Sequence, residues 1–291
     1  IGLGYVGLPM FSILSNVKKN KSYLYEVHGI EKNNKIGDFI KYCFKNKKIW
    51  INDSSDKTFI KYLKNSFNRS GTYIRTDFEK LSQSDIIIVS INFEIKNSLD
   101  ETFLNLKKLS KDIAQNVKRK ALVIFESTLP PGTSDRIILP IFKNILKKRN
   151  LKIKDIYFSY SFERVMPGEN YIKSITENHR CYSGINKESK EKCKNFLKTF
   201  INIKKFKLYE LKSITECEAT KILENSYRAI NISLIDEWTK ISNFLKIDVF
   251  NMVNAIKLRK THSNIMRPGL GVGGYCLTKD PNFINYSLKN L

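Results

Sequence analysis

The alternation of apolar runs and amphipathic stretches is the feature that most restricts the fold of this chain. Short runs rich in β-branched and aromatic residues are expected to be strands, at residues 26–30, 85–91, 121–127, 155–160 and 180–184. Charged amphipathic stretches, such as residues 100–117, separate them. Apolar strands that alternate with helices predict a parallel sheet covered on both faces. An α/β domain with a doubly wound parallel sheet is therefore expected over residues 1–210.

The pattern changes near residue 211. Residues 212–245 contain no Gly or Pro and carry apolar residues at three- and four-residue steps, which predicts one long helix. A second helix is expected at 248–258. We therefore predict an all-α domain over residues 211–291, built on the long helix.

Composition restricts the setting of the protein. No apolar run approaches the ~20 residues needed to span a bilayer, and the five cysteines include no CxxC pair. We expect a cytoplasmic protein without disulfides or a membrane partner. The net charge of +23 is spread over all segments, so it favours anionic ligands without forming the basic and aromatic patch of a nucleic-acid binder. The three histidines are scattered, and no metal site is expected.

The opening residues carry a G-x-G-x-x-G pattern, in which glycines let a backbone approach a pyrophosphate at a helix N-terminus. We expect this loop to bind a dinucleotide through Gly2, Gly4, Tyr5, Val6 and Gly7. The pattern predicts a Rossmann-type domain. Its first strand is represented only by Ile1, so we expect the chain to be an internal piece of a longer product.

Glu31 ends the run at 26–30, 24 residues after Gly7. A carboxylate at about this distance accepts hydrogen bonds from the ribose hydroxyls and repels a 2′-phosphate, which favours NAD over NADP. The nearby Lys32 and Lys35 weaken this preference, and a merely solvated acid at the strand end is the alternative.

Two further candidates follow predicted strands and so belong to the carboxyl edge of the sheet, where open α/β sheets bind ligands. In "ESTLPPGTSD", Thr128 has a hydroxyl that can hold a water or a substrate hydroxyl, and Pro131 predicts a helix start near residue 131. In "SYSFERVMPGEN", Glu163 and Arg164 follow the next strand. The alternatives are an ordinary helix-start turn and a surface ion pair.

On the long helix, Lys221 and Asn225 are four residues apart and share a face. Together they offer two donors to a developing oxyanion. Taken alone, this pair is equally typical of a helical surface.

The stretch "RPGLGVGGYCLTKDP", residues 267–281, places four glycines before Cys276 and Lys279–Asp280 after it. The missing side chains leave room for a bulky anionic substrate, with Arg267 at the entrance. A thiolate that attacks an aldehyde gives an adduct that can lose hydride and become a thioester. A buried structural cysteine is the alternative.

Five motifs occur in a fixed order: "GLGYVGLP", "ESTLPPGT", "ERVMPG", "EATKILENSYRAINIS" and "GVGGYCLTKD". In these motifs, and over essentially its whole length, the chain resembles the UDP-glucose/GDP-mannose dehydrogenases. The resemblance implies an NAD-dependent, four-electron oxidation of the C6 hydroxyl of a UDP-sugar to a carboxylate, with two NAD per sugar. It also implies a homodimer formed through the long helix.

The resemblance assigns roles to individual residues. Cys276 would be the nucleophile, Lys221 and Asn225 would stabilise the oxygen of the tetrahedral intermediates, and Glu163 would act as general acid or base. Asp280, with Thr128 and a water, would handle protons in the first oxidation and position water for thioester hydrolysis. The implied substrate contacts are Glu163, Arg164, Lys221, Asn225, Arg267 and Gly273. The implied NAD contacts are Gly2, Gly4, Tyr5, Val6, Gly7, Glu31 and Thr128.

Three features qualify this resemblance. "SINFEIKN" stands where the family has Thr-Pro near the cofactor, which puts that part of the NAD site in doubt. We expect the family's C-terminal UDP-binding domain to be missing from this chain, and we therefore expect the chain alone to have little or no activity. "ERVMPG" resembles the branch that oxidises UDP-N-acetylhexosamines, mannosamine or glucosamine, more than the UDP-glucose branch.

Two other classes remain open at this stage. A two-electron β-hydroxyacid dehydrogenase shares a Rossmann domain, a long helix and a catalytic lysine, but has no use for Cys276. A basic scaffold that binds nucleic acid would show salt-sensitive binding and no dependence on Cys276.

Overall fold

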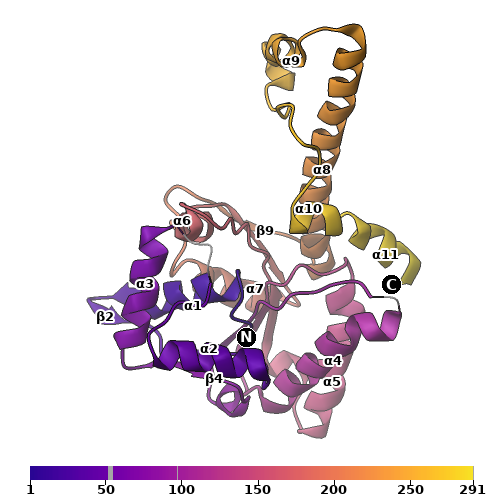
Figure 1. Ribbon diagram of the computed structural model, residues 1–291. Helices are drawn as coiled ribbons and strands as arrows, with labels where there is room; N and C mark the ends of the chain where they lie inside the picture. The colour runs from indigo at the N-terminus through magenta and orange to yellow at the C-terminus, as the bar shows by residue number, and fades with distance from the viewer. Residues whose placement is uncertain (52–54, 97, 291) are drawn as a thin grey trace. The chain divides into compact units, whose positions relative to one another are not determined.

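The computed structural model describes residues 1–51, 55–96 and 98–290 (Figure 1). The chain divides into two compact units, residues 1–218 and 219–291, and each is described by itself. The domain boundary expected near residue 210 stays a prediction.

The first unit contains all five expected strands: β3 (Val27–Ile30), β5 (Ile86–Val89), β6 (Leu122–Phe125), β7 (Tyr157–Tyr160) and β8 (Arg180–Gly184). It also contains β4 (Thr72–Arg75), β9 (Leu208–Glu210) and a small hairpin of β1 (Lys18–Lys19) and β2 (Ser22–Tyr23). Strands β3 and β4 pair in parallel, and the other sheet has the order β5-β6-β7-β8-β9. Only β7 and β8 are antiparallel in that sheet. The predicted Rossmann-type α/β fold is confirmed, with a mixed rather than purely parallel sheet.

Helices alternate with these strands: α1 (Gly7–Asn16), α2 (Lys35–Lys45), α3 (Lys57–Asn68), α4 (Leu99–Asn116), α5 (Leu139–Lys148), α6 (Tyr171–Thr176) and α7 (Lys187–Leu197). Shorter helical turns are η1 (Glu79–Ser82), the π-helical η2 (Ser134–Ile138) and η3 (Ile153–Asp155). Several helices begin at a polar residue whose side chain accepts the first free N–H groups, namely Asn34, Asp56, Ser98 and Asn186. The strands are fully buried where helices cover them, as in β6 and β8.

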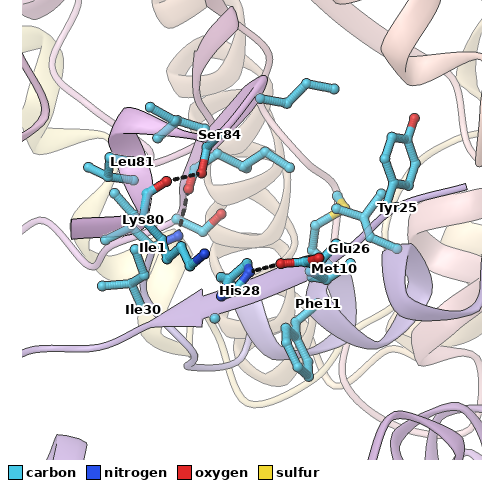
Figure 2. A pocket seen from close by; sticks show the side chains of 18 of the residues that line it. Ile1, Met10, Phe11, Tyr25, Glu26, His28, Ile30, Lys80, Leu81 and Ser84 are labelled. Carbon is cyan, nitrogen blue, oxygen red and sulfur yellow. Dashed lines mark hydrogen bonds and ion pairs between the residues drawn. The ribbon is translucent and has the colours of Figure 1, made fainter. Parts of the chain in front are cut away.

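Residues 1 and 2 join the two sheets. The Ile1 amine donates to the carbonyl of Ile88 in β5 (2.6 Å), and the Gly2 N–H donates to the carbonyl of Ile30 in β3 (2.8 Å). A cavity of about 530 Å³ lies beside this junction. Figure 2 shows the side chains around it, from α1 (Met10, Phe11), β3 (His28, Ile30) and η1 (Lys80, Leu81). The glycine loop therefore starts where the carboxyl ends of β3 and β5 come together.

The second unit is helical, in agreement with the all-α domain predicted for residues 211–291. Its main element is α8 (Ile214–Leu245), whose first turns belong to the first unit. Then follow α9 (Val249–Lys257), η4 (Lys260–His262), α10 (Tyr275–Lys279) and α11 (Asn282–Asn290). Its small core packs Ile235 of α8 against Val249 and Val253 of α9. Within the described ranges, no helix combines the length and the apolar character needed to cross a membrane.

Candidate functional site

The glycine loop has the shape that a dinucleotide needs. Gly2 has a φ of +86°, and a Cβ there would lie 2.6 Å from the Ser90 carbonyl oxygen. A Cβ at Gly7, where α1 begins, would lie 1.7 Å from the Gly2 carbonyl oxygen. A Cβ at Gly4 would meet no atom within 4 Å. Two glycines are thus required for packing, and the third leaves open space at the N-terminus of a helix, where a pyrophosphate fits.

The side chains around this loop hold its backbone. The Glu31 carboxylate accepts the Leu3 N–H (2.8 Å) through one oxygen and its neighbour's N–H (3.0 Å) through the other. The buried Tyr171 hydroxyl donates to the Tyr5 carbonyl, and the Trp50 indole donates to the Leu3 carbonyl (3.3 Å). Val6 precedes α1 in a helical conformation. The fit to NAD is good, because Glu31 is already oriented at the loop.

The unusual stretch "SINFEIKN" lies beside the loop over residues 90–96, and Asn97 is outside the described residues. The Ser90 N–H donates to the Ile1 carbonyl (2.9 Å), and the Ile91 N–H donates to the Ser127 hydroxyl (2.9 Å). Phe93 is buried and packs on Phe103 of α4. The stretch is therefore built into the fold, whatever its effect on cofactor binding.

Thr128 lies in the turn that follows β6 and is half-buried. Its hydroxyl makes no hydrogen bond within the described part of the chain, so it can serve a ligand. The helix expected near residue 131 begins later, with η2 at Ser134. The cause is Gly132, whose φ of +91° is incompatible with a right-handed helix.

Glu163 and Arg164 differ in environment. Glu163 is buried, at 8% exposure, and accepts the Val165 N–H. Arg164 donates to the His179 carbonyl and lies over the Phe162 ring at 5.1 Å. The carboxylate of Glu163 is therefore held by a backbone N–H. The guanidinium of Arg164 already binds a backbone carbonyl within the first unit.

A buried ion pair that we did not predict lies at the same sheet edge. Glu126 directly follows β6 and pairs with Arg180 of β8, and both are at most 3% exposed. Arg180 also donates to the Ser161 hydroxyl (3.0 Å), and the Ser90 hydroxyl donates to Glu126 (3.2 Å). Burial raises the pKa of Glu126, and Arg180 opposes that shift. The pair links the strand ends that surround the glycine loop.

In the second unit, Cys276 lies in the first turn of α10, after two glycines with left-handed backbone, Gly271 (φ +81°) and Gly274 (φ +83°). Cys276 is exposed, whereas the other four cysteines are buried. A Cβ at Gly273 would meet no atom within 4 Å, and Arg267 is exposed at the loop entrance. The turn thus presents a thiol in an open backbone environment.

Asp280 connects this turn to the long helix. It is 1% exposed, and its Oδ2 accepts the Asn225 amide N–H at 2.6 Å. Its N–H donates to the Cys276 carbonyl (2.9 Å). The Lys279 ammonium lies 3.2 Å from Oδ1, but no partner in the described chain completes a well-directed hydrogen bond to this oxygen. Oδ1 therefore keeps acceptor capacity for a water or a hydroxyl.

Lys221 is 7% exposed and lies one turn before Asn225 on α8. The structure thus brings Asn225, Asp280 and the Cys276 backbone together within one unit. Within the other unit it sets the glycine loop, Thr128 and Glu163 at the carboxyl ends of the strands.

The α/β fold and the glycine loop are those of an NAD-binding domain, which a helical unit follows. The NAD binding domain of the UDP-glucose/GDP-mannose dehydrogenase family matches residues 1–201, and the central domain of the same family matches residues 215–291. The chain belongs to the UDP-glucose/GDP-mannose dehydrogenase family.

Similar proteins carry more specific names. The UDP-N-acetyl-D-mannosamine dehydrogenases of Methanocaldococcus jannaschii and Methanococcus maripaludis are 33% and 35% identical over 298 residues. Those matches cover 100% of this chain and 61% of each relative. The solved UDP-D-ManNAc dehydrogenase of Pyrococcus horikoshii superposes with a TM-score of 0.81 at 26% identity, over 100% of this chain and 64% of that one. The chain therefore spans less than two thirds of the length of these relatives.

Proposed function

We propose that the protein oxidises the C6 hydroxyl of a UDP-N-acetylhexosamine to a carboxylate, with UDP-N-acetyl-D-mannosamine as its first candidate substrate. One observation carries this proposal: the exposed Cys276 is joined through α10 to a buried Asp280 that is hydrogen-bonded to Asn225 of α8. Asn225 lies 55 residues before Asp280 in the sequence, and a two-electron dehydrogenase has no need for such a thiol. The names of the relatives support the N-acetylmannosamine sugar.

Two NAD molecules, bound one after the other, would each accept one of the two hydrides that the sugar carbon loses. The residues of the chain would do the rest. The Cys276 thiolate would add to the C6 aldehyde, and the adduct would become a thioester when its carbon loses the second hydride. Water would then cleave the thioester, which releases the carboxylate and restores the thiol.

The local geometry supports separate roles for the polar groups. Asn225 holds Asp280 by one carboxylate oxygen, and the other oxygen can accept a proton from a hydroxyl or a water. Lys221 and Asn225 would stabilise the oxyanions of the tetrahedral intermediates. Glu163 would serve as acid or base in the hydrolysis, and the Thr128 hydroxyl would hold the ordered water. Arg267, Arg164 and Gly273 would contact the nucleotide sugar.

A second copy of the chain is the partner we propose for α8. Exposed apolar residues follow one face of this helix at steps of three, four and seven residues: Leu223, Tyr227, Ile230, Leu234 and Ile241. A row of this kind is the seam through which long helices pack on each other. We call these five residues the α8 apolar row.

The test measures NADH produced per sugar by the protein expressed from its complete gene. We expect two NADH per molecule of UDP-N-acetylmannosamine, and slower or no reaction with UDP-N-acetylglucosamine and UDP-glucose. One NADH per sugar would instead support a two-electron dehydrogenase. Faster turnover of UDP-glucose would contradict the proposed substrate and identify the protein as a UDP-glucose dehydrogenase.

A further inference from the structure

Glu218 is a buried carboxylate that none of the proposed chemical steps uses. It lies in the first turns of α8 and is 0% exposed. Its Oε2 accepts the Gly132 N–H at 2.7 Å. Its Oε1 accepts both the N–H (2.9 Å) and the hydroxyl (2.6 Å) of Ser134. Three donors from one short segment thus converge on a carboxylate that comes from another element, 84 or more residues away in the sequence.

The physical reason for this contact lies at the start of η2. The first N–H groups of a helix have no partner inside the helix, and a negative charge at that end is favourable. Thr133, which precedes η2, provides no side-chain cap. Glu218 supplies the cap from a distance. Burial raises the pKa of Glu218 to about 8, although the three hydrogen bonds favour the carboxylate.

The other end of the same turn is also held. The Ser127 carbonyl accepts the Tyr160 hydroxyl at 2.9 Å, and the Ser127 hydroxyl accepts the Ile91 N–H at 2.9 Å. Cys217, next to Glu218, directs its thiol toward the Tyr160 carbonyl (3.8 Å). The turn from Thr128 to Gly132 is therefore anchored at both ends, and the Thr128 hydroxyl projects from a fixed backbone.

We propose that Glu218 is a positioning residue: its carboxylate ties the Thr128–Gly132 turn to the first turns of α8 and so fixes the Thr128 hydroxyl for the oxidation. This inference rests on the proposed function for its kinetic consequence. The structural part, the anchoring of the turn, stands on the three hydrogen bonds alone.

The test compares Glu218→Gln with Glu216→Gln, in the protein expressed from its complete gene. Gln keeps the size of the side chain but turns one acceptor into a donor that faces an N–H. Glu216 lies on the same turn, is exposed and accepts the Lys212 N–H at 2.7 Å. It is therefore the matched control. Residue-resolved hydrogen exchange and steady-state kinetics are measured for both variants above pH 8, where Glu218 of the wild type is a carboxylate.

We expect Glu218→Gln to speed exchange at the Gly132 and Ser134 amides ~10-fold or more, which corresponds to the loss of about one hydrogen bond. Its kcat should fall ~10-fold or more while the KM for NAD stays within about twofold, because a small misplacement of a reacting group affects mainly the chemical step. Glu216→Gln should match the wild type in both measurements.

Ser134→Ala removes only the hydroxyl donor, so it should show the same changes at smaller size even if Glu218→Gln does not fold. Unchanged exchange at both amides in these variants would overturn the anchoring. Faster exchange with an unchanged kcat would reduce Glu218 to a structural cap and overturn its positioning role. If the wild type oxidises no UDP-sugar, the proposed function fails and the kinetic role with it, while the exchange result still decides whether Glu218 anchors the turn.

Discussion

The five cysteines of this chain differ in burial, and burial determines how reactive each thiol is. Burial raises the pKa of the Cys43, Cys193 and Cys217 thiols, to about 12 for Cys193. Cys181 is buried as well, and Cys276 alone is exposed. Because the thiolate is the nucleophile, an accessible thiol reacts far faster than a buried one.

We therefore expect iodoacetamide to label Cys276 first in the folded chain, with the other four thiols modified only on unfolding. Peptide mapping by mass spectrometry over a time course measures this directly. The rapid phase should vanish in Cys276→Ser. Equally rapid labelling of a second cysteine in the native state would contradict the environment described for it.

Glu218 also gives a pH dependence of stability. Its pKa is about 8 in the folded chain against 4.5 ordinarily, so the unfolded chain releases the proton first as the pH rises. The free energy of unfolding must then fall between about pH 4.5 and pH 8. Urea unfolding across this range should show a steeper fall for the wild type than for Glu218→Gln, which cannot titrate there. Parallel curves would show that Glu218 does not titrate in this window.

At the residue scale, the sequence predicts the groups that motifs mark and misses those that only folding brings together. Thr128, Glu163 and Cys276 follow recognisable strand ends or glycines. Glu126 and Glu218 each begin one of the five motifs, but the sequence does not show what they bind, because their partners lie 54 to 86 residues away.

At the scale of elements, long periodic segments were predicted well. The helix expected at 212–245 is α8 (Ile214–Leu245), and the helix expected at 248–258 is α9 (Val249–Lys257). Four strands were not predicted, namely β1, β2, β4 and β9. They are short and have exposed positions, so their sequences show no continuous apolar run. The direction of β8 is a property of its pairing with β7, which no local pattern encodes.

One contact between elements has a consequence for the cofactor. Tyr171, the first residue of α6, donates its hydroxyl to the Tyr5 carbonyl in the glycine loop. In Tyr171→Phe the loop loses a buried hydrogen bond worth about 1 kcal/mol, which corresponds to ~5-fold weaker NAD binding. Isothermal titration with NAD measures this.

Tyr182→Phe is the matched control for that experiment. Tyr182 is also buried, but its hydroxyl donates to Glu210 of β9 (3.1 Å), which is not part of the loop. We expect its NAD affinity to stay at the wild-type value. An equal loss of affinity in both variants would mean that general stability, and not the loop, is responsible.

At the scale of the whole molecule, the exposed apolar side chains of α8 predict that two copies of the chain form a dimer. The α8 apolar row places Ile230, which is 67% exposed, near its middle. A charge buried there in a dimer would have no partner and would oppose association strongly. We expect Ile230→Glu to shift the protein from dimer to monomer in analytical ultracentrifugation. Leu258 is also apolar, is more exposed than Ile230 and lies outside the row, so Leu258→Glu should leave the dimer intact. A monomeric wild type would contradict the proposed partner.

The central claim is that the Cys276 sulfur forms a covalent bond to the C6 carbon of the sugar between the two oxidations. The direct measurement is the NADH produced by Cys276→Ser, expressed from the complete gene, with UDP-N-acetylmannosamine. The account predicts at most one NADH per active site and no uronic acid, because serine is a far weaker nucleophile than a thiolate and the aldehyde cannot be carried into a thioester. Repeated turnover with two NADH per sugar in this variant would contradict it.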